Sequence, residues 1–140
     1  MNIPELLFNL SIHYNALIRK SASELGLTAS QAFHLISIPY DGISMSSLSK
    51  KLGLDTSTLT RNIARLESMN LVQKNQNDYD RRIQTITITK NGSDMVDKID
   101  EFLNEINHYL VENLDMDTQE YSLEILEKLV WSMDCLRENQ

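Results

Sequence analysis

The segment MSSLSKKLGLDTSTLTRNIARLESMNLV constrains the fold of this chain more than any other. Its apolar spacing predicts a short helix over about 46–52, a turn through Gly53-Leu54 and a longer helix over about 56–69. Asp55 or Thr56 is the expected N-cap, because a short polar side chain can accept a hydrogen bond from the first turn. Two short helices joined by a tight turn that contains glycine form a helix-turn-helix pattern.

After this segment the hydrophobic period changes from that of a helix to that of a strand. Alternating residues over 71–74 and 84–89, rich in β-branched types in the second run, predict two strands. The polar, turn-forming stretch NQNDYDRR lies between them and ends in Arg81 and Arg82. We therefore expect a two-stranded hairpin with a basic tip.

Amphipathic helices are predicted on both sides of this central part. Apolar residues recur in steps of three and four over 3–24, over 91–113, and again from about 117 to the end of the chain. A further helix is predicted over about 29–38. It is expected to open with a capping box at Thr28-Ala-Ser-Gln31, in which each side chain bonds the backbone N–H of the other residue.

The composition agrees with a helical fold of modest size. Only 4 glycines and 2 prolines are present and aromatic residues make up 6%, which disfavours a sheet-rich fold with many tight turns. A length of 140 residues with 41% apolar residues suits one domain over 1–140. We predict a mainly α fold with a small β-hairpin wing, that is, a winged helix-turn-helix with helices added at both ends.

The terminal helices carry wider apolar stripes than the small central module can bury. Packing against the same helices of a second copy would bury them, so we expect a symmetric homodimer. A monomeric helical bundle is the alternative. The prediction divides the chain into a helical dimerisation region, 1–42 and 91–140, and a DNA-binding module over 43–90.

Several classes of protein are disfavoured by what the sequence lacks. Cys135 is the single cysteine and cannot form an intrachain disulfide, and the N-terminus does not resemble a signal peptide, so a cytoplasmic protein is expected. No apolar run approaches the roughly 18 residues needed to cross a membrane, so no membrane partner is expected. The sequence carries no Gly-rich phosphate loop, HExxH pair or Cys–His signature. We therefore expect neither an enzyme nor a cofactor.

The net charge of −7 counts against nucleic-acid binding only if it is spread evenly. Residues 44–90 hold eight basic and four acidic residues, a net charge of +4, whereas 91–140 hold three basic and thirteen acidic residues, a net charge of −10. Residues 1–43 contribute −1. A phosphate backbone that meets the central module therefore meets positive charge.

The helix over 56–69 has two distinct faces. At about 100° per residue, Leu59, Ile63 and Leu66 share one face, which we expect to be buried. The opposite face and its flanks carry small polar residues and arginines, namely Ser57, Thr60, Arg61, Ala64, Arg65 and Ser68. Arg61 can donate two hydrogen bonds to guanine or to phosphate, and the hydroxyl groups suit phosphate. A merely solvated helix face is the alternative.

Arg81 and Arg82 at the hairpin tip also allow two interpretations. A basic β-ribbon beside a recognition helix can lay an arginine into the neighbouring minor groove. Either arginine can instead pair with Asp78 or Asp80. The nearby helix-turn-helix pattern favours a contact with DNA.

The stretch LSKKLGLDTSTLTRNIARLESMNLV, followed by DYDRRIQTITITKNG, resembles the MarR (multiple antibiotic resistance regulator) family. The residues that fall on the wing pattern of that family are Asp80, Arg82, Ile88, Thr89 and Gly92. Ile88 stands where leucine is usual. Asn70 stands where the turn after the recognition helix commonly has glycine, and asparagine tolerates the left-handed backbone that such a turn requires.

The resemblance implies a homodimeric transcriptional regulator, expected to be a repressor, that binds double-stranded DNA at a pseudo-palindromic operator. The recognition helix, 56–69, would enter the major groove and the wing, 72–89, the minor groove. Half-site centres are expected about 10 base pairs apart, or a multiple of that. The residues carried over for DNA contact are Ser57, Thr58, Thr60 and Arg61 in the helix, with Arg65 at its flank, and Arg82 with Arg81 in the wing. A winged module that binds protein instead of DNA is the alternative.

Relatives in this family respond to small phenolic ligands or to oxidants. Four aromatic or imidazole residues could line an effector crevice, with core packing as the alternative role: His13, Tyr14, Phe33 and His34. Oxidant-sensing members carry a cysteine in the first helix, whereas Cys135 lies in the last predicted helix, where a packing role is expected.

A metal site is not expected, although one group of residues has suitable spacing. His108 lies one helical turn from both Glu105 and Glu112, which would place three metal-binding types on neighbouring turns. Acidic residues and histidine are common on exposed helix faces, so we predict a solvated surface there.

Overall fold

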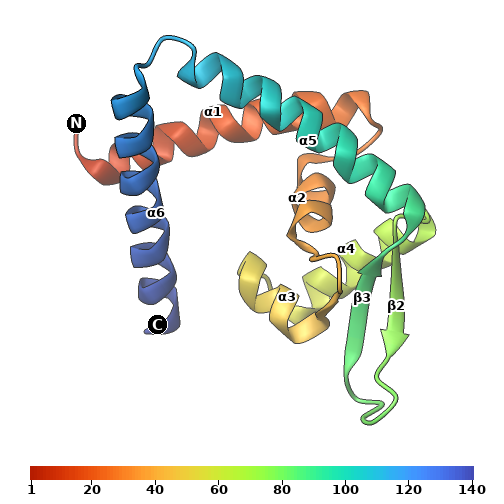
Figure 1. The fold of residues 1–140 in the computed structure, drawn as a ribbon. Helices are drawn as coiled ribbons and strands as arrows, with labels where there is room; N and C mark the ends of the chain where they lie inside the picture. Colours follow the sequence, from red (N-terminus) through yellow and green to blue (C-terminus); the bar gives the residue numbers. More distant parts are fainter. The chain divides into compact units, whose positions relative to one another are not determined.

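The structure is a computed structural model that describes all 140 residues. It confirms the mainly α class with a small wing. The elements in chain order are α1 (Ile3–Glu24), α2 (Ala29–Ser37), β1 (Ile43–Ser44), α3 (Met45–Leu52), α4 (Thr56–Ser68), β2 (Val72–Gln76), β3 (Gln84–Ile88), α5 (Lys90–Val111) and α6 (Met116–Glu138) (Figure 1). None of the helices combines the length and the apolar character that a membrane span requires. The chain forms two compact units, Met1–Phe102 and Leu103–Gln140, and each is described by itself.

Local side-chain chemistry explains where the helices of the first unit begin. The predicted capping box before α2 is confirmed: the Gln31 N–H donates to Thr28 Oγ1 at 3.1 Å, and the Thr28 N–H donates to Gln31 Oε1 at 2.9 Å. Asp55 is the N-cap of α4, and of the two residues that the sequence allows for this role, Asp55 and Thr56, the structure uses the first. The turn between α3 and α4 uses Gly53 in the left-handed region, with φ of 65°, which glycine adopts without steric cost.

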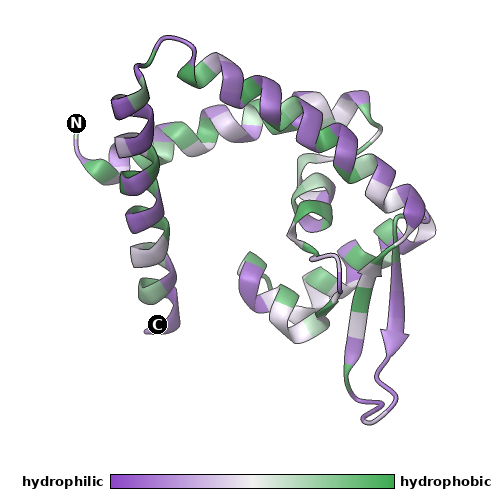
Figure 2. Ribbon diagram, in the orientation of Figure 1, coloured by the Kyte–Doolittle hydropathy of each residue, from purple (hydrophilic) through white to green (hydrophobic).

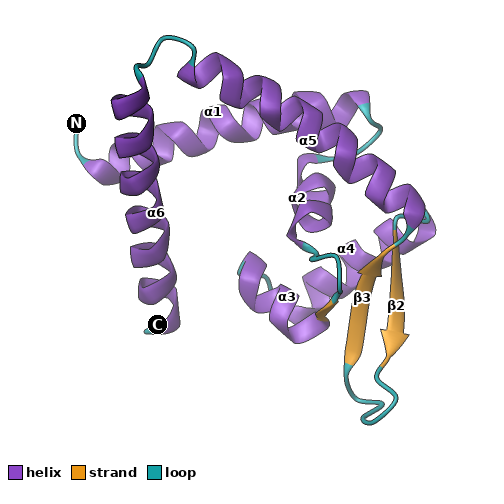
Figure 3. Ribbon diagram, in the orientation of Figure 1, coloured by secondary structure: helices purple, strands orange, loops and turns teal.

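The wing sheet has three antiparallel strands in the order β1-β3-β2 (Figure 3). The sequence prediction did not include β1, which pairs with β3 through Ile43↔Ile86 and Ser44↔Thr85. A strand of two residues is too short to show an alternating pattern, which is the signal that strand prediction uses. The hairpin itself is confirmed, with β2 paired to β3 from Val72↔Ile88 to Gln76↔Gln84.

The core of the first unit confirms the predicted buried face of α4. Leu59, Ile63 and Leu66 are each 0% exposed. They share the core with fully or almost fully buried residues from other elements, namely Ile18, Leu35, Leu48, Ile86 and Ile99. The recognition helix is therefore held by the helices before it and by the sheet.

Close backbone packing joins α5 to the end of α4. Asn70 adopts the left-handed conformation, with φ of 58°, as its position in the sequence predicts. The Thr89 hydroxyl donates to the Asn70 carbonyl oxygen at 2.6 Å and accepts from the Gly92 N–H at 3.0 Å. A side chain at Gly92 would meet the Leu71 carbonyl oxygen, so only glycine allows this approach.

The second unit contains the end of α5 and all of α6. Asp115 caps α6, and the N–H and hydroxyl groups of Thr118 lower the pKa of its carboxyl group by donating to it. No residue of α6 is buried within the single chain. Apolar residues nevertheless recur along α6, as the green segments of Figure 2 show. The predicted helical stripe is present, and the chain by itself leaves it uncovered.

Candidate nucleic-acid interface

Helix α4 exposes the polar face that its sequence predicts. Ser57, Thr60, Arg61 and Arg65 are exposed, whereas Thr58 is half-buried at the first turn. No ion pair or side-chain hydrogen bond engages the guanidinium groups of Arg61 and Arg65 in the structure. Both cationic groups are therefore open to an external anion.

The hydroxyl groups at the start of α4 are engaged within the protein. Ser57 Oγ donates to Asp55 Oδ1 at 2.6 Å and Thr58 Oγ1 donates to Asp55 Oδ2 at 2.8 Å. These bonds, with the Thr58 N–H, hold the pKa of the Asp55 carboxyl group well below its usual range. Thr60 Oγ1 donates to the Thr56 carbonyl oxygen at 2.7 Å. The three hydroxyl groups keep lone pairs free, but donation to a phosphate requires each proton to change its partner.

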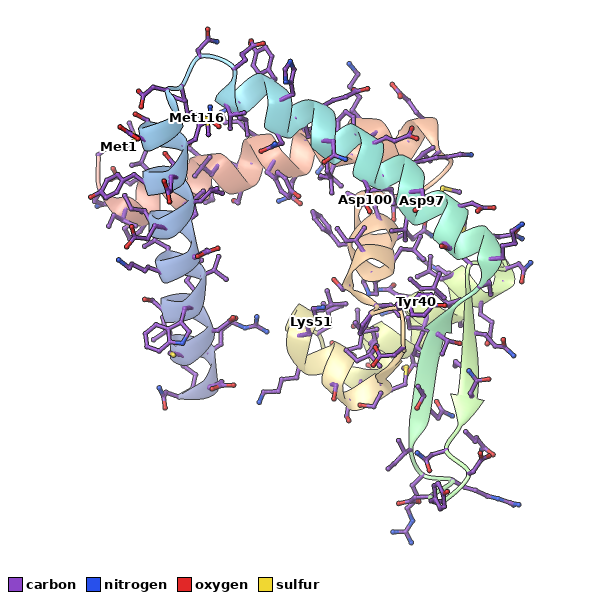
Figure 4. All side chains as sticks on the ribbon, in the orientation of Figure 1. Met1, Tyr40, Lys51, Asp97, Asp100 and Met116 are labelled. Carbon is purple, nitrogen blue, oxygen red and sulfur yellow. The ribbon has the colours of Figure 1, made fainter.

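Backbone hydrogen bonds order the loop of the wing. Asn77 Oδ1 accepts from the Tyr79 N–H at 2.8 Å, and Asp80 Oδ1 accepts from the Arg82 N–H at 3.0 Å. The alternative that Asp78 or Asp80 pairs with a guanidinium group is not what the structure shows, since no ion pair involves Arg81 or Arg82. The loop extends beyond the strands and its side chains project from it (Figure 4). Asp80 thus shapes the loop and leaves both arginines exposed.

One hollow joins the wing to the helix-turn-helix. It has a volume of about 290 Å³, and residues from the end of β1, the start of α3, the first half of α4, and the wing loop with the start of β3 line it: Ser44, Met45, Ser46, Thr56, Thr60, Arg82, Ile83 and Gln84. Arg82 and Thr60, which are far apart in the sequence, meet here. The sequence prediction missed Ser44, Ser46, Thr56 and Gln84. Ser44 had a detectable signal, because a serine directly before a helix is a common N-cap.

The candidate crevice residues are only partly brought together. Phe33 and His34 line a cavity of about 300 Å³ with Asn15, Ala29, Ser30, Leu52 and Leu54. The ring of Tyr14 lies 6.3 Å from that of Phe33, centre to centre, but Tyr14 does not line the cavity. His13 is exposed and lies outside the lining as well.

Residues that bind metals do not gather in this structure. Histidine, cysteine and acidic side chains form no group of three suited to a metal ion, and His108 is exposed. Cys135 is a half-buried free thiol in α6.

Comparison with known proteins identifies the architecture. The model of the MarR family matches residues 27–84, which include α2, α3, α4 and most of the wing. Over this stretch, which is less than half of the chain, the chain is similar to the MarR family. The chain is 24% identical over 89 residues to an uncharacterized HTH-type transcriptional regulator, YdgJ, of Bacillus subtilis. That match covers 64% of this chain and 54% of the relative, so the chain spans about half the length of this curated relative.

Solved structures match more of the chain. A cysteine-to-serine mutant of MarR from E. coli, complexed with operator DNA, is 27% identical with a TM-score of 0.75, and the match covers 91% of this chain and 94% of that one. A MarR protein from Peptoclostridium difficile is 25% identical with a TM-score of 0.86, covering 99% of this chain and 92% of that one. These relatives agree with the prediction of a regulator rather than an enzyme.

Proposed function

We propose that this chain is a member of the MarR family and a transcriptional regulator, acting as a repressor, that binds double-stranded DNA sequence-specifically as a homodimer. The single observation that carries the proposal is the shared hollow, in which Arg82 of the wing meets the outward face of the recognition helix α4. The similar MarR structure in complex with operator DNA supports the same mode of binding.

Each element receives a distinct role in this proposal. Helix α4 enters the major groove, where Arg61 reads a guanine or holds a phosphate, with Ser57, Thr58, Thr60 and Arg65 as further contacts. The wing places Arg82, with Arg81, in the flanking minor groove. The exposed, unpaired guanidinium groups support these roles, because each can bind DNA without first breaking an internal ion pair.

The homodimer is proposed from the uncovered apolar residues of the terminal helices. In α1, Phe8 is 66% exposed, and in α6, Val130 is 53% and Leu136 is 61% exposed. A second copy of the same helices would bury such stripes and set two recognition helices on one duplex. The operator is then a pseudo-palindrome with half-site centres about 10 base pairs apart, or a multiple of that.

A small-molecule effector is proposed for the cavity beside α2. Its lining is mainly apolar, with the aromatic ring of Phe33 and the imidazole of His34, and its volume is about 300 Å³. Tyr14, whose ring is tilted by 37° against that of Phe33, and His13 are candidates for the rim of this crevice.

Selection of genomic DNA fragments by the purified protein, followed by sequencing, tests the proposed function. We expect a palindromic motif, and affinity for it that falls steeply with salt because arginine–phosphate contacts release counterions. Absence of salt-dependent binding to any duplex at low salt would contradict the proposal and favour a winged module that binds protein.

The dimer and the direction of regulation need separate measurements. Light scattering should give twice the chain mass of 16.1 kDa at micromolar concentration. A reporter gene fused to a selected promoter should be expressed more strongly when the regulator is absent. A monomer in solution, or a promoter that needs the protein for expression, would contradict the corresponding part of the proposal.

A further inference from the structure

His34 is a buried polar side chain that the proposed DNA contacts do not use. It lies in α2, is 2% exposed, and sits among apolar core residues. Its Nδ1 lies 2.5 Å from the Ser30 carbonyl oxygen, and its Nε2 lies 3.2 Å from Nδ2 of Asn62, on α4. An apolar residue would fill the same position without any cost of burying polar atoms. The bond to the recognition helix therefore needs an explanation.

The two partners fix which nitrogen of His34 carries the proton. A carbonyl oxygen only accepts hydrogen bonds, so Nδ1 must be the donor to Ser30. Nε2 of the neutral ring then has a free lone pair, and the amide of Asn62 donates to it. Both ring nitrogens are satisfied, and the resulting bond ties α2 to α4 in one orientation.

Such a directional bond supplies what the apolar core of α4 does not. Contacts among Leu59, Ile63 and Leu66 are non-directional and tolerate a small rotation of the helix. A rotation of about 20° moves an atom about 6 Å from the helix axis by about 2 Å, which is more than a hydrogen bond to a base edge tolerates. Asn62 is adjacent to Arg61, so holding Asn62 also sets the direction of Arg61.

His34 lies at the wall of a cavity but is itself almost completely enclosed. His34 and Phe33 line the cavity of about 300 Å³ between α2 and the turn after α3. Helix α2 also packs against α4 (Figure 1). Packing encloses the ring, and its two hydrogen bonds set the orientation in which it is held.

We propose that His34 is a positioning residue for the recognition helix: through Asn62 it sets the rotation of α4 at which Arg61 and Thr60 meet the bases. The inference rests on the proposed DNA-binding function. His34 also belongs to the residues that line the cavity, so it joins the proposed effector crevice to α4.

The test replaces both partners by apolar groups of similar shape in the double variant H34F/N62L. Such a replacement costs little stability, because no buried polar group loses its partner, and it changes no charge. We expect unfolding like that of the parent, but at least tenfold weaker binding to the strongest fragment from the genomic selection. Binding to an unrelated duplex and the salt dependence should not change, since no phosphate contact is lost.

Matched variants separate positioning from general damage. S37A removes the hydroxyl group of a half-buried residue of α2 that donates only within that helix, to the Phe33 carbonyl oxygen, so its operator affinity should equal that of the parent. If the double variant does not fold, the single variant N62L replaces it. The quantity measured for each variant is the ratio of its affinity for the selected fragment to its affinity for an unrelated duplex. An unchanged ratio in a folded variant overturns the inference.

Two results distinguish this inference from the function on which it rests. Failure of the parent itself to bind any duplex contradicts the proposed function, and the positioning role falls with it. Long-range proton–nitrogen NMR spectra of the parent should show His34 protonated on Nδ1 alone. A ring protonated on Nε2 alone would contradict the proposed bond, even if the parent binds DNA.

Discussion

Helices α4 and α6 are both amphipathic, yet only α4 buries its apolar face within the single chain. In α4, Leu59, Ile63 and Leu66 are 0% exposed, whereas α6 has no buried residue along its 23 residues. The comparison teaches that an apolar stripe predicts burial but does not identify the partner. The partner of α4 lies in its own module, and for α6 we propose a second copy of the chain.

The two regions also differ in charge. Residues 44–90 carry a net charge of +4 and residues 91–140 a net charge of −10. The overall charge of −7 therefore excludes only a uniform coating of DNA by the whole surface. A positive module and a negative C-terminal region would instead favour approach of DNA to the module alone.

The largest effect is expected from disrupting the proposed contact between α6 and a second copy of the chain. Leu126→Glu places a charge on the apolar stripe of both copies at once. Burial of a leucine contributes about 1.5–3 kcal/mol, so two copies lose about 3–6 kcal/mol. Sedimentation should show that the dissociation constant of the dimer rises at least about 100-fold. Lys128→Ser, which changes the charge by the same amount on the opposite face of α6, should leave the dimer intact; equal losses would contradict the proposed interface.

The next largest effect is expected in the packed module, where the apolar face of α4 is buried, and it concerns the stability of the fold. In Gly92→Ala, the new Cβ would lie 2.0 Å from the Leu71 carbonyl oxygen and 2.8 Å from Ile88 Cγ2. We expect a loss of about 3 kcal/mol in the free energy of unfolding, measured with urea. The matched change Gly26→Ala meets no atom within 4 Å and has φ of +75°, so only backbone strain of about 1 kcal/mol is expected. A smaller loss at Gly92 than at Gly26 would contradict the packing argument.

A third prediction separates the two arginine positions of the positive module. Arg61→Ala should weaken operator binding by about 1–3 kcal/mol and relax the preference for one base pair, because a base contact is lost. Arg82→Ala should weaken binding to all duplexes and lower the salt slope by about one unit. Gel-shift titrations measure both effects, with Arg19→Ala on α1 as the charge-matched control. Variants that bind like the parent would refute the assignment.

The smallest effect concerns the N-cap of α4. Because the pKa of Asp55 is lowered in the folded protein, its contribution to stability is complete above the ordinary aspartate pKa of about 3.9 and is lost as the pH falls below it. The stability difference between the parent and Asp55→Asn should therefore shrink on going from about pH 5 into this acidic range. Urea unfolding at several pH values measures it, and a difference independent of pH would contradict the assignment. Asp78→Asn, at an exposed carboxylate without a hydrogen-bond partner, is the control.

Much of the fold could be predicted from the sequence because its signals are local. Helix period, the cap at Asp55, the capping box at Thr28 and the left-handed turn at Asn70 depend on residues within one or two turns of the chain. The buried face of α4 followed from angular spacing alone. The outward face of α4 and the pair of wing arginines could also be named from the sequence, and their DNA-binding roles stay predictions.

Tertiary structure decided the features that depend on contacts between distant residues. Strand β1 forms because Ile43 pairs with Ile86 of β3. Glycine is required at position 92 because the Leu71 backbone lies against it. The spacing of residues along the chain likewise does not predict the hydrogen bond between His34 and Asn62, or that Thr60 and Arg82 line the same hollow. The sequence determines the elements through short-range backbone and side-chain preferences. Their mutual placement depends on how the elements bury apolar surface and pair polar groups together.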